Sequence, residues 1–222
     1  MKTSNTGILI IHGFAGSRGE TAPLKNFLED CGFTVSCPVL PGHESTRKNF
    51  AKAKYGDWIS AAAEAAIELE KNCDRLIIIG FSMGGMIGAH LCRNMNVERL
   101  ILINTPVYYW DFKQMAKNLR CDFGVYSRKY LAECTNKPFM ALIQFQKLLS
   151  KTKPLFSKLA CPVLIIQTLD DDTVNSKSAD YIFRNIPGEK YIKKYEVGGH
   201  WVLDTDTSKD IFFETERFSK AL

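Results

Sequence analysis

Short apolar stretches alternate with helical patterns along most of this sequence, and this alternation constrains the fold more than any other feature. After an apolar stretch at 7–11, apolar side chains recur across 24–31 at the spacing of one helix face. Strands separated by helices usually pair in parallel, so the alternation predicts an α/β fold: a mostly parallel sheet flanked by helices. The stretches expected to form its strands are 7–11, 33–39, 75–79, 100–103, 163–167 and 191–195.

The alternation breaks between the strands expected at 100–103 and 163–167. Residues 107–158 contain no apolar strand, but they do contain helical stretches rich in aromatic and basic side chains. A loop of that length without secondary structure would be unusual in a compact domain, so we expect a small helical cap inserted between the two strands. With 222 residues the chain fits one domain, 1–222, that carries the cap at approximately 107–158.

Positive charge is concentrated in this cap. The formal net charge of the chain is only +5. Between 107 and 160, however, ten Lys and Arg stand against three acidic residues, Asp111, Asp122 and Glu133. Such a segment is most often a solvated face, and weak contact with an anionic lipid surface is the alternative. No nucleic-acid-binding signature accompanies the charge, so we expect no nucleic-acid partner.

Several classes of protein are excluded by what the sequence lacks. No apolar run approaches the roughly 18 residues of a membrane-spanning helix, and the run at 8–11 is too short for a signal peptide. We therefore expect a cytoplasmic protein without stable membrane insertion. The seven cysteines form no C-x-x-C, which argues against a disulfide framework or a zinc site. No metal-binding, phosphate-binding or dinucleotide-binding motif is present, so we expect no metal and no cofactor.

A G-x-S-x-G motif spans residues 80–84, directly after the strand expected at 75–79. A helix is expected to follow it, at 83–95. A serine at a sharp strand-to-helix turn lies in strained backbone, and the flanking glycines leave room for that turn. Ser82 is therefore the candidate nucleophile. A glycine-rich turn whose serine only caps the helix would have the same letters, but the position between an apolar strand and a helix favours the catalytic interpretation.

Together with HGFAGS at 12–17, this motif resembles the α/β-hydrolase superfamily, and in particular its compact microbial carboxylesterases and monoacylglycerol lipases. The resemblance extends over nearly the whole chain, since it includes LPGH at 40–43, the cap, and GGH at 198–200. It implies an α/β-hydrolase fold, acyl transfer to the serine, and an oxyanion hole made by the backbone N–H groups of Phe14 and Met83.

A serine hydroxyl is a weak nucleophile and needs a general base nearby. The resemblance implies that the serine, the acid and the histidine follow one another in that order along the chain. His12 and His43 precede Ser82, and His90 lies about two turns into the helix that follows it. His200 remains, and we predict that it is the general base.

The third triad member is expected in the loop after the strand at 163–167, which carries three adjacent aspartates. Its carboxylate would hold the imidazole in one tautomer and stabilise the imidazolium. Spacing alone does not separate Asp170, Asp171 and Asp172. The D-x-x-V pattern of the family matches at Asp171, which we therefore predict, with its two neighbours shaping the loop or facing solvent. In some family members the acid follows the preceding strand, where this chain has Asn104.

The cap provides an amphipathic helix at 139–149, whose apolar face could line an acyl-chain tunnel or only pack on the main domain. The function that follows is a serine carboxylesterase acting on a small-molecule ester of short to medium chain length, with monoacylglycerols as one candidate class. An acyl-CoA thioesterase and a non-catalytic ligand-binding protein on a hydrolase fold are the alternatives. The predicted substrate-binding residues are Phe14, Tyr108, Trp110, Phe139 and Ile143.

Overall fold

The computed structural model describes residues 5–109 and 112–221, without the side chains at 112–113 and 132–136. In that part of the chain, six strands form one sheet in the order β2-β1-β3-β4-β5-β6, and every neighbouring pair is parallel. The prediction of a mostly parallel α/β sheet is confirmed. The strands are β1 (Thr6–Ile11), β2 (Thr34–Ser36), β3 (Arg75–Phe81), β4 (Arg99–Ile103), β5 (Val163–Thr168) and β6 (Lys190–Tyr195).

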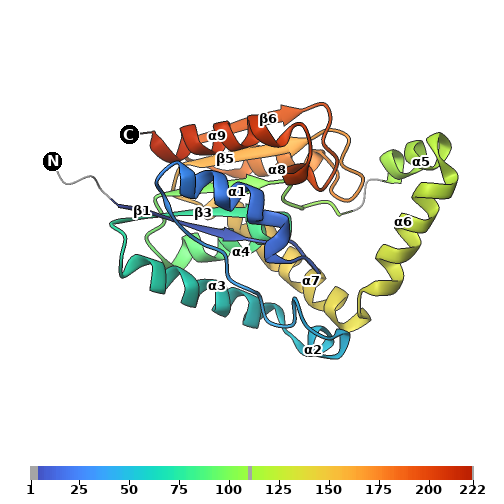
Figure 1. Cartoon of the computed structure of the whole chain (residues 1–222), viewed down its shortest axis with the longest axis horizontal. Coiled ribbons are helices and arrows are strands. Elements are labelled where there is room, and N and C mark those ends of the chain that lie inside the picture. Colours follow the sequence, from blue (N-terminus) through green and yellow to red (C-terminus); the bar gives the residue numbers. More distant parts are fainter. Residues whose placement is uncertain (1–4, 110–111, 222) are drawn as a thin grey trace.

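Helices cover both faces of the sheet (Figure 1). Successive side chains of a strand point to opposite faces, so each central strand contributes to two cores. In β1, Ile8 and Ile10 are buried on one face, whereas Leu9 and Ile11 are buried on the other. The helices on the first face are α1 (Arg18–Asp30) and α9 (Ser208–Lys220), and those on the second are α3 (Tyr55–Glu70), α4 (Met83–Asn94) and α8 (Lys177–Asn185).

The edge strand β2 is shorter than the stretch predicted at 33–39. Pro38 has no N–H group to donate to a neighbouring strand, and the chain leaves the sheet after Ser36. It then forms a short helix that the sequence patterns do not indicate, α2 (Arg47–Lys52). This helix packs against the cap helix α7 (Phe139–Thr152).

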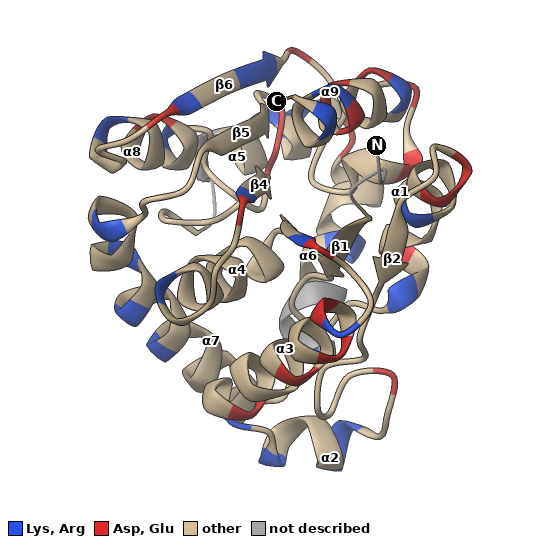
Figure 2. Ribbon diagram, turned by 90° about the vertical axis from the view of Figure 1, so that its left-hand side faces the viewer, with Lys and Arg blue, Asp and Glu red and all other residues tan. Residues whose placement is uncertain are grey.

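In the described residues, three α-helices and one short 3-10 helix, Lys153–Lys158, lie between β4 and β5, where the sequence predicts the cap. The first two, α5 and α6, form a hairpin that stands away from the sheet, whereas α7 runs back along the main body and packs on α3 and α4 (Figure 1). Basic residues occur along α7 and acidic residues along α3 (Figure 2). The bounds of the hairpin helices are Phe112–Cys121 for α5 and Phe123–Asn136 for α6. None of the helices in the described residues has the length and apolar character needed to cross a membrane.

Candidate active site

Ser82 occupies the sharp turn between β3 and α4. Its backbone has φ 52° and ψ −118°, a region that residues other than glycine rarely adopt. Two glycines make this turn sterically possible: a Cβ at Gly80 would overlap the backbone of Gly85, and one at Gly84 would overlap the carbonyl group of Ile11. At Ser82, the end of β3, the start of α4 and the end of β1 therefore approach one another more closely than any side chain at these two positions would allow.

The loop after β1, residues 13–16, lies directly against Ser82. A Cβ at Gly13 would come within 3.4 Å of the Ser82 Cβ. Phe14 and Met83, whose backbone N–H groups are predicted to form the oxyanion hole, thus lie on the two segments that flank the serine. Met83 is the first residue of α4, where backbone N–H groups have no partner within the helix.

Two buried histidines support this loop. The backbone N–H of Leu40 donates to His12 Nε2 at 3.3 Å, and that of Ala15 donates to His43 Nε2 at 3.2 Å. Burial lowers the pKa of both rings, that of His43 to about 4. Both rings are therefore neutral at neutral pH and keep Nε2 as an acceptor, that of His12 for Leu40 and that of His43 for Ala15 of the loop.

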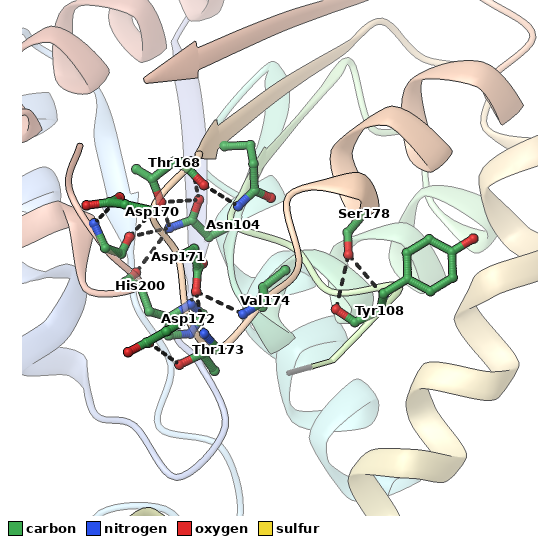
Figure 3. Close-up of polar contacts among 12 residues, drawn as sticks. Asn104, Tyr108, Thr168, Asp170, Asp171, Asp172, Thr173, Val174, Ser178 and His200 are labelled. Carbon is green, nitrogen blue, oxygen red and sulfur yellow. Dashed lines mark hydrogen bonds and ion pairs between the residues drawn. The ribbon is translucent and has the colours of Figure 1, made fainter. Parts of the chain in front are cut away.

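His200 lies in the loop after β6 and is held by Asp171 (Figure 3). Nδ1 of His200 is 2.8 Å from Oδ2 of Asp171, and Oδ1 of Asp171 accepts the backbone N–H groups of Thr173 and Val174, both at 2.8 Å. The carboxylate, only 1% exposed, is thus fixed through both oxygens. This arrangement favours the tautomer with its proton on Nδ1, which leaves Nε2 of the ring as an acceptor. Ser82 and His200 line the same cavity.

The aspartate before Asp171 has a different partner. The carboxylate of Asp170 accepts the backbone N–H groups of Gly198 and Gly199, at 3.2 and 2.8 Å. Asp170 therefore shapes the turn that precedes His200. Of the three adjacent aspartates, only Asp171 contacts the imidazole ring.

The aspartate after Asp171, Asp172, binds the α5–α6 hairpin of the cap to the loop that follows β5. Its Oδ2 accepts hydrogen bonds from Asn118 of α5 and from Lys129 and Tyr130 of α6, at 3.0, 2.7 and 2.9 Å. Burial opposes the charge of this carboxylate, but the hydrogen bonds from Lys129, Tyr130 and Thr173 and the charge of Lys129 together hold the pKa of Asp172 below its usual value. The expectation that the neighbours of Asp171 shape the loop or face solvent describes Asp170 but not Asp172, which is buried because three cap donors converge on it.

Asn104, directly after β4, links the end of β5 to the loop that carries His200. No such role is predicted for it from the sequence. Its Oδ1 accepts the backbone N–H of Thr168, and its Nδ2 donates to the Thr168 hydroxyl and to the carbonyl groups of Gly199 and His200 (Figure 3). The residue is fully buried and has a positive φ of 47°. A polar residue directly after a wholly apolar strand is the sequence signal that points to it.

The cavity at Ser82 has a volume of about 460 Å³. No residue of α5 or α6 contributes to its lining in the part of the chain that the structure describes. The cap's share of the wall comes from Tyr109, from Lys137 and Pro138 just before α7, and from Phe145 of α7. Aromatic and charged side chains occur together around it. The aromatic ones are Phe14, Phe50, Phe81, Tyr109, Phe145 and Trp201, and the charged ones are Glu20, Glu44, Arg47 and Lys137.

The structure separates the predicted substrate-binding residues. Phe14 lines the cavity. Phe139 and Ile143, however, line a separate groove on the outer side of α7, together with Tyr55. Residues two positions apart in a helix, such as Ile143 and Phe145, point about 200° apart around the helix axis. Because Phe145 is buried in the cavity wall, Ile143 faces away from the cavity.

The two remaining predicted residues lie before α5. Tyr108 does not line the cavity: its ring packs edge-on against Tyr181, with centroids 5.9 Å apart, and Lys153 Nζ lies 5.0 Å from its centroid. Its neighbour Tyr109 lines the cavity instead. Trp110 lies outside the described residues.

Glu20, in the first turn of α1, is a cavity residue that the sequence does not indicate. An acidic residue in a first helical turn is ordinarily explained by the helix dipole alone. Burial raises the pKa of this carboxyl group to about 7. No group of three or more His, Cys, Asp and Glu residues within the described ranges is arranged to hold a metal ion.

Comparison with known proteins assigns this architecture to a family. The family model for the alpha/beta hydrolase fold matches residues 7–152. The chain belongs to the α/β-hydrolase fold family. The resemblance inferred from the G-x-S-x-G motif and the loop at 12–17 is therefore confirmed.

Relatives of this α/β-hydrolase span nearly its full length. It is 27% identical over 227 residues to a thermostable monoacylglycerol lipase of Bacillus sp. (strain H-257), with 96% of this chain and 90% of that protein covered. It is 21% identical over 222 residues to a carboxylesterase of Bacillus subtilis (strain 168), with 95% and 90% covered. A solved structure from work on the metagenome-derived lipolytic enzymes LipS and LipT has a TM-score of 0.83 at 22% identity, covering 98% of this chain and 94% of that one, and shares its fold.

Proposed function

We propose that this α/β-hydrolase is a serine carboxylesterase that hydrolyses short-to-medium-chain carboxylic esters, monoacylglycerols among them, through Ser82, His200 and Asp171. One observation carries the proposal: Asp171 holds His200 through a 2.8 Å contact, and His200 shares a cavity with a serine in strained backbone. The coarser statement, that the chain is a carboxylic ester hydrolase, is supported by its family and by the names of both curated relatives.

In the proposed reaction, His200 Nε2 accepts the hydroxyl proton of Ser82 while Oγ attacks the ester carbonyl. Asp171 keeps the ring oriented and stabilises the imidazolium that forms. The backbone N–H groups of Phe14 and Met83 donate to the oxyanion, and a preorganised donor of this kind typically contributes roughly 3–4 kcal/mol. The alcohol leaves with the proton from His200, and a water activated by the same ring then releases the acid from Ser82.

The walls of the cavity support the proposed substrate class. A volume of about 460 Å³ lies within the range of roughly 300–1,000 Å³ that is usual for small-molecule sites. Phe145 and Trp201 offer apolar surface for an acyl chain, and the charged side chains of Glu44 and Arg47 offer polar contacts for an alcohol that carries hydroxyl groups. An ester with a modest acyl chain and a polar alcohol therefore suits the site.

An acyl-CoA thioester is the second candidate substrate. Arg47 and Lys137 both line the cavity, and α7 carries further basic residues (Figure 2), among them Lys147 and Lys151. Positive charge of this kind attracts an anionic, cofactor-linked acyl group. The triad chemistry would be the same, since a thioester carbonyl is attacked in the same way as an ester carbonyl.

Turnover of matched substrates tests the proposal. Wild type, Ser82→Ala and Ser60→Ala are compared on p-nitrophenyl esters from acetate to laurate, on monoacylglycerols and on acyl-CoA of the same chain lengths. We expect ester turnover to peak at a short or medium chain, to fall by at least about 10³-fold in Ser82→Ala, and to be unchanged in Ser60→Ala, because Ser60 is exposed on α3. Undiminished turnover in Ser82→Ala would overturn the triad, and a higher kcat/KM for acyl-CoA would favour the thioesterase.

A further inference from the structure

The carboxylate of Glu20 lies flush against the backbone of the loop at 13–16. Its Oε2 accepts the backbone N–H of Gly13 at 3.4 Å, and the backbone N–H of Ser17 also donates to it. A Cβ at Gly16 would overlap both carboxylate oxygens, so only glycine allows the side chain to approach this closely. Glu20 thus contacts both ends of the short loop that carries the predicted oxyanion donor.

The same loop separates Glu20 from the nucleophile by a single residue. A Cβ at Gly13 would lie 3.4 Å from the Ser82 Cβ on one side and 3.5 Å from Glu20 Oε2 on the other. Glu20 and Ser82 also line one cavity. Any movement of this carboxylate is therefore transmitted through one peptide unit to the surroundings of Ser82.

Holding an ionised carboxylate here is costly. Burial raises the pKa of Glu20 to about 7, although the N–H groups of Gly13 and Ser17 and the charges of His200 and Lys137 oppose this effect. An apolar side chain at this position would avoid the cost of desolvation. The described titratable and charged groups that share the cavity wall with Glu20 are His43, Glu44, Arg47, Lys137 and His200.

We propose that Glu20 is a positioning residue for ester hydrolysis: its ionised carboxylate clamps the loop at 13–16, so that the Phe14 N–H stays aimed at the oxyanion of the substrate. The inference rests on the proposed role of Ser82 as nucleophile. Ionisation matters because a carboxylate only accepts hydrogen bonds, whereas a protonated carboxyl group turns an O–H donor toward N–H groups that are themselves donors. Protonation therefore releases one of the two N–H contacts and loosens the loop.

Two substitutions at this position separate charge from shape. Glu20→Gln keeps one acceptor oxygen in nearly the same volume, whereas Glu20→Ala removes the clamp. Glu29→Gln is the matched control, because Glu29 is exposed on the same helix and forms an ion pair with Lys25. In Glu20→Ala we expect kcat to fall about 10- to 100-fold with KM within about threefold of wild type, since an oxyanion donor acts in the transition state.

The pH profile distinguishes a clamp from a merely structural role. Both the general base and Glu20 must lose a proton in the wild type, so the acid limb of log kcat/KM has a slope near 2 over about one decade of activity. Glu20→Gln has a slope near 1, and Glu29→Gln keeps the wild-type profile. If Glu20→Ala fails to fold, the Glu20→Gln profile still decides between the two roles.

The outcomes separate this inference from the proposed function. A Glu20→Gln profile identical to that of wild type, or wild-type kcat in Glu20→Ala, would overturn the role of Glu20 while Ser82→Ala remains inactive. Ser82→Ala that still turns over the ester would overturn the proposed nucleophile itself, whatever the Glu20 variants do.

Discussion

Replacing Asp171 by asparagine tests the proposed triad through a change of tautomer. Oδ1 of Asp171 accepts the N–H groups of Thr173 and Val174, and Oδ2 faces Nδ1 of His200, all at 2.8 Å. Asparagine has the same shape, but one of its two terminal groups is an NH₂ donor. If that donor faced the two backbone N–H groups, donors would oppose donors, so the NH₂ group must face His200.

The size of this preference follows from the two backbone contacts. The reversed orientation would lose two buried hydrogen bonds, at about 1–1.5 kcal/mol each, or about 3 kcal/mol together, which is a preference of about a hundredfold. With the amide donating to Nδ1, the ring of His200 carries its proton on Nε2 and cannot accept the proton of Ser82. This preference removes about a hundredfold of activity, and loss of the carboxylate charge that stabilises the imidazolium removes the rest. We therefore expect kcat to fall about 10⁴-fold with little change in KM, as is typical for this substitution in a Ser-His-Asp triad.

The assay is kcat for p-nitrophenyl butyrate, with thermal melting to show that each variant is folded. Asp180→Asn is the matched control, because Asp180 forms a half-exposed ion pair with Lys194 and does not line the cavity at Ser82. We expect it to have wild-type activity. Activity of Asp171→Asn within tenfold of wild type, or a 10⁴-fold loss in Asp170→Asn instead, would refute the assignment of the acid.

Four further outcomes are expected. Gly85→Ala would bring a Cβ into overlap with the buried side chain of Thr105. It should lower the free energy of unfolding by about 1–3 kcal/mol, seen as a melting temperature lower by several degrees. Asp172→Asn weakens the fastening of the cap hairpin, so limited proteolysis between α5 and α6 should be faster than in wild type. The Sγ atoms of Cys92 and Cys161 lie 3.9 Å apart, so hydrogen peroxide should oxidise the two thiols to a disulfide and two waters, and peptide mapping should find the linked pair. Burial holds the pKa of His43 at about 4 against an ordinary value of 6.5, so the unfolded chain binds this proton first as the pH falls. The free energy of unfolding should therefore decline between pH 6.5 and 4 in urea titrations, and less so in His43→Gln.

Buried strands are the part of this fold that the sequence predicts best. β3, β4 and β5 are covered on both faces, so their side chains are apolar in unbroken runs that are easily recognised. The edge strand β2 lacks such a run and ends before Pro38, and α2 is too short to show a helical period. β2 and α2, which the sequence predicts poorly, are thus short elements that lack a buried apolar run.

The sequence predicts the candidate site residues best where a local motif or the order along the chain restricts the choice to one residue. Ser82 follows from the glycines that its turn requires, and His200 follows from its order along the chain. The choice among three adjacent aspartates depends on which neighbouring loop each carboxylate meets, and spacing carries no information about that. Nor does it show that Glu20 turns toward the loop at 13–16, since an acidic residue in a first helical turn is favourable without any such contact.

Helix phase explains why two of the predicted substrate-binding residues, Phe139 and Ile143, lie outside the cavity at Ser82. Most side chains of α7 between Phe139 and Phe145 are apolar, so the sequence does not show which face meets the main domain. The structure buries Ala141 and Phe145 and leaves Phe139 exposed. Which face of α7 is buried is therefore determined by how the helix packs on α3 and α4, and not by its own sequence pattern.

Covalent labelling with a fluorophosphonate probe tests the central claim, that Ser82 is an activated nucleophile, most directly. Wild type, Ser82→Ala and Ser60→Ala are incubated with the probe, digested and mapped by mass spectrometry. We expect about one equivalent of probe per chain on Ser82 in wild type and in Ser60→Ala, and no adduct in Ser82→Ala. An unlabelled Ser82 in folded wild type, or an adduct on another residue that persists in Ser82→Ala, would contradict it.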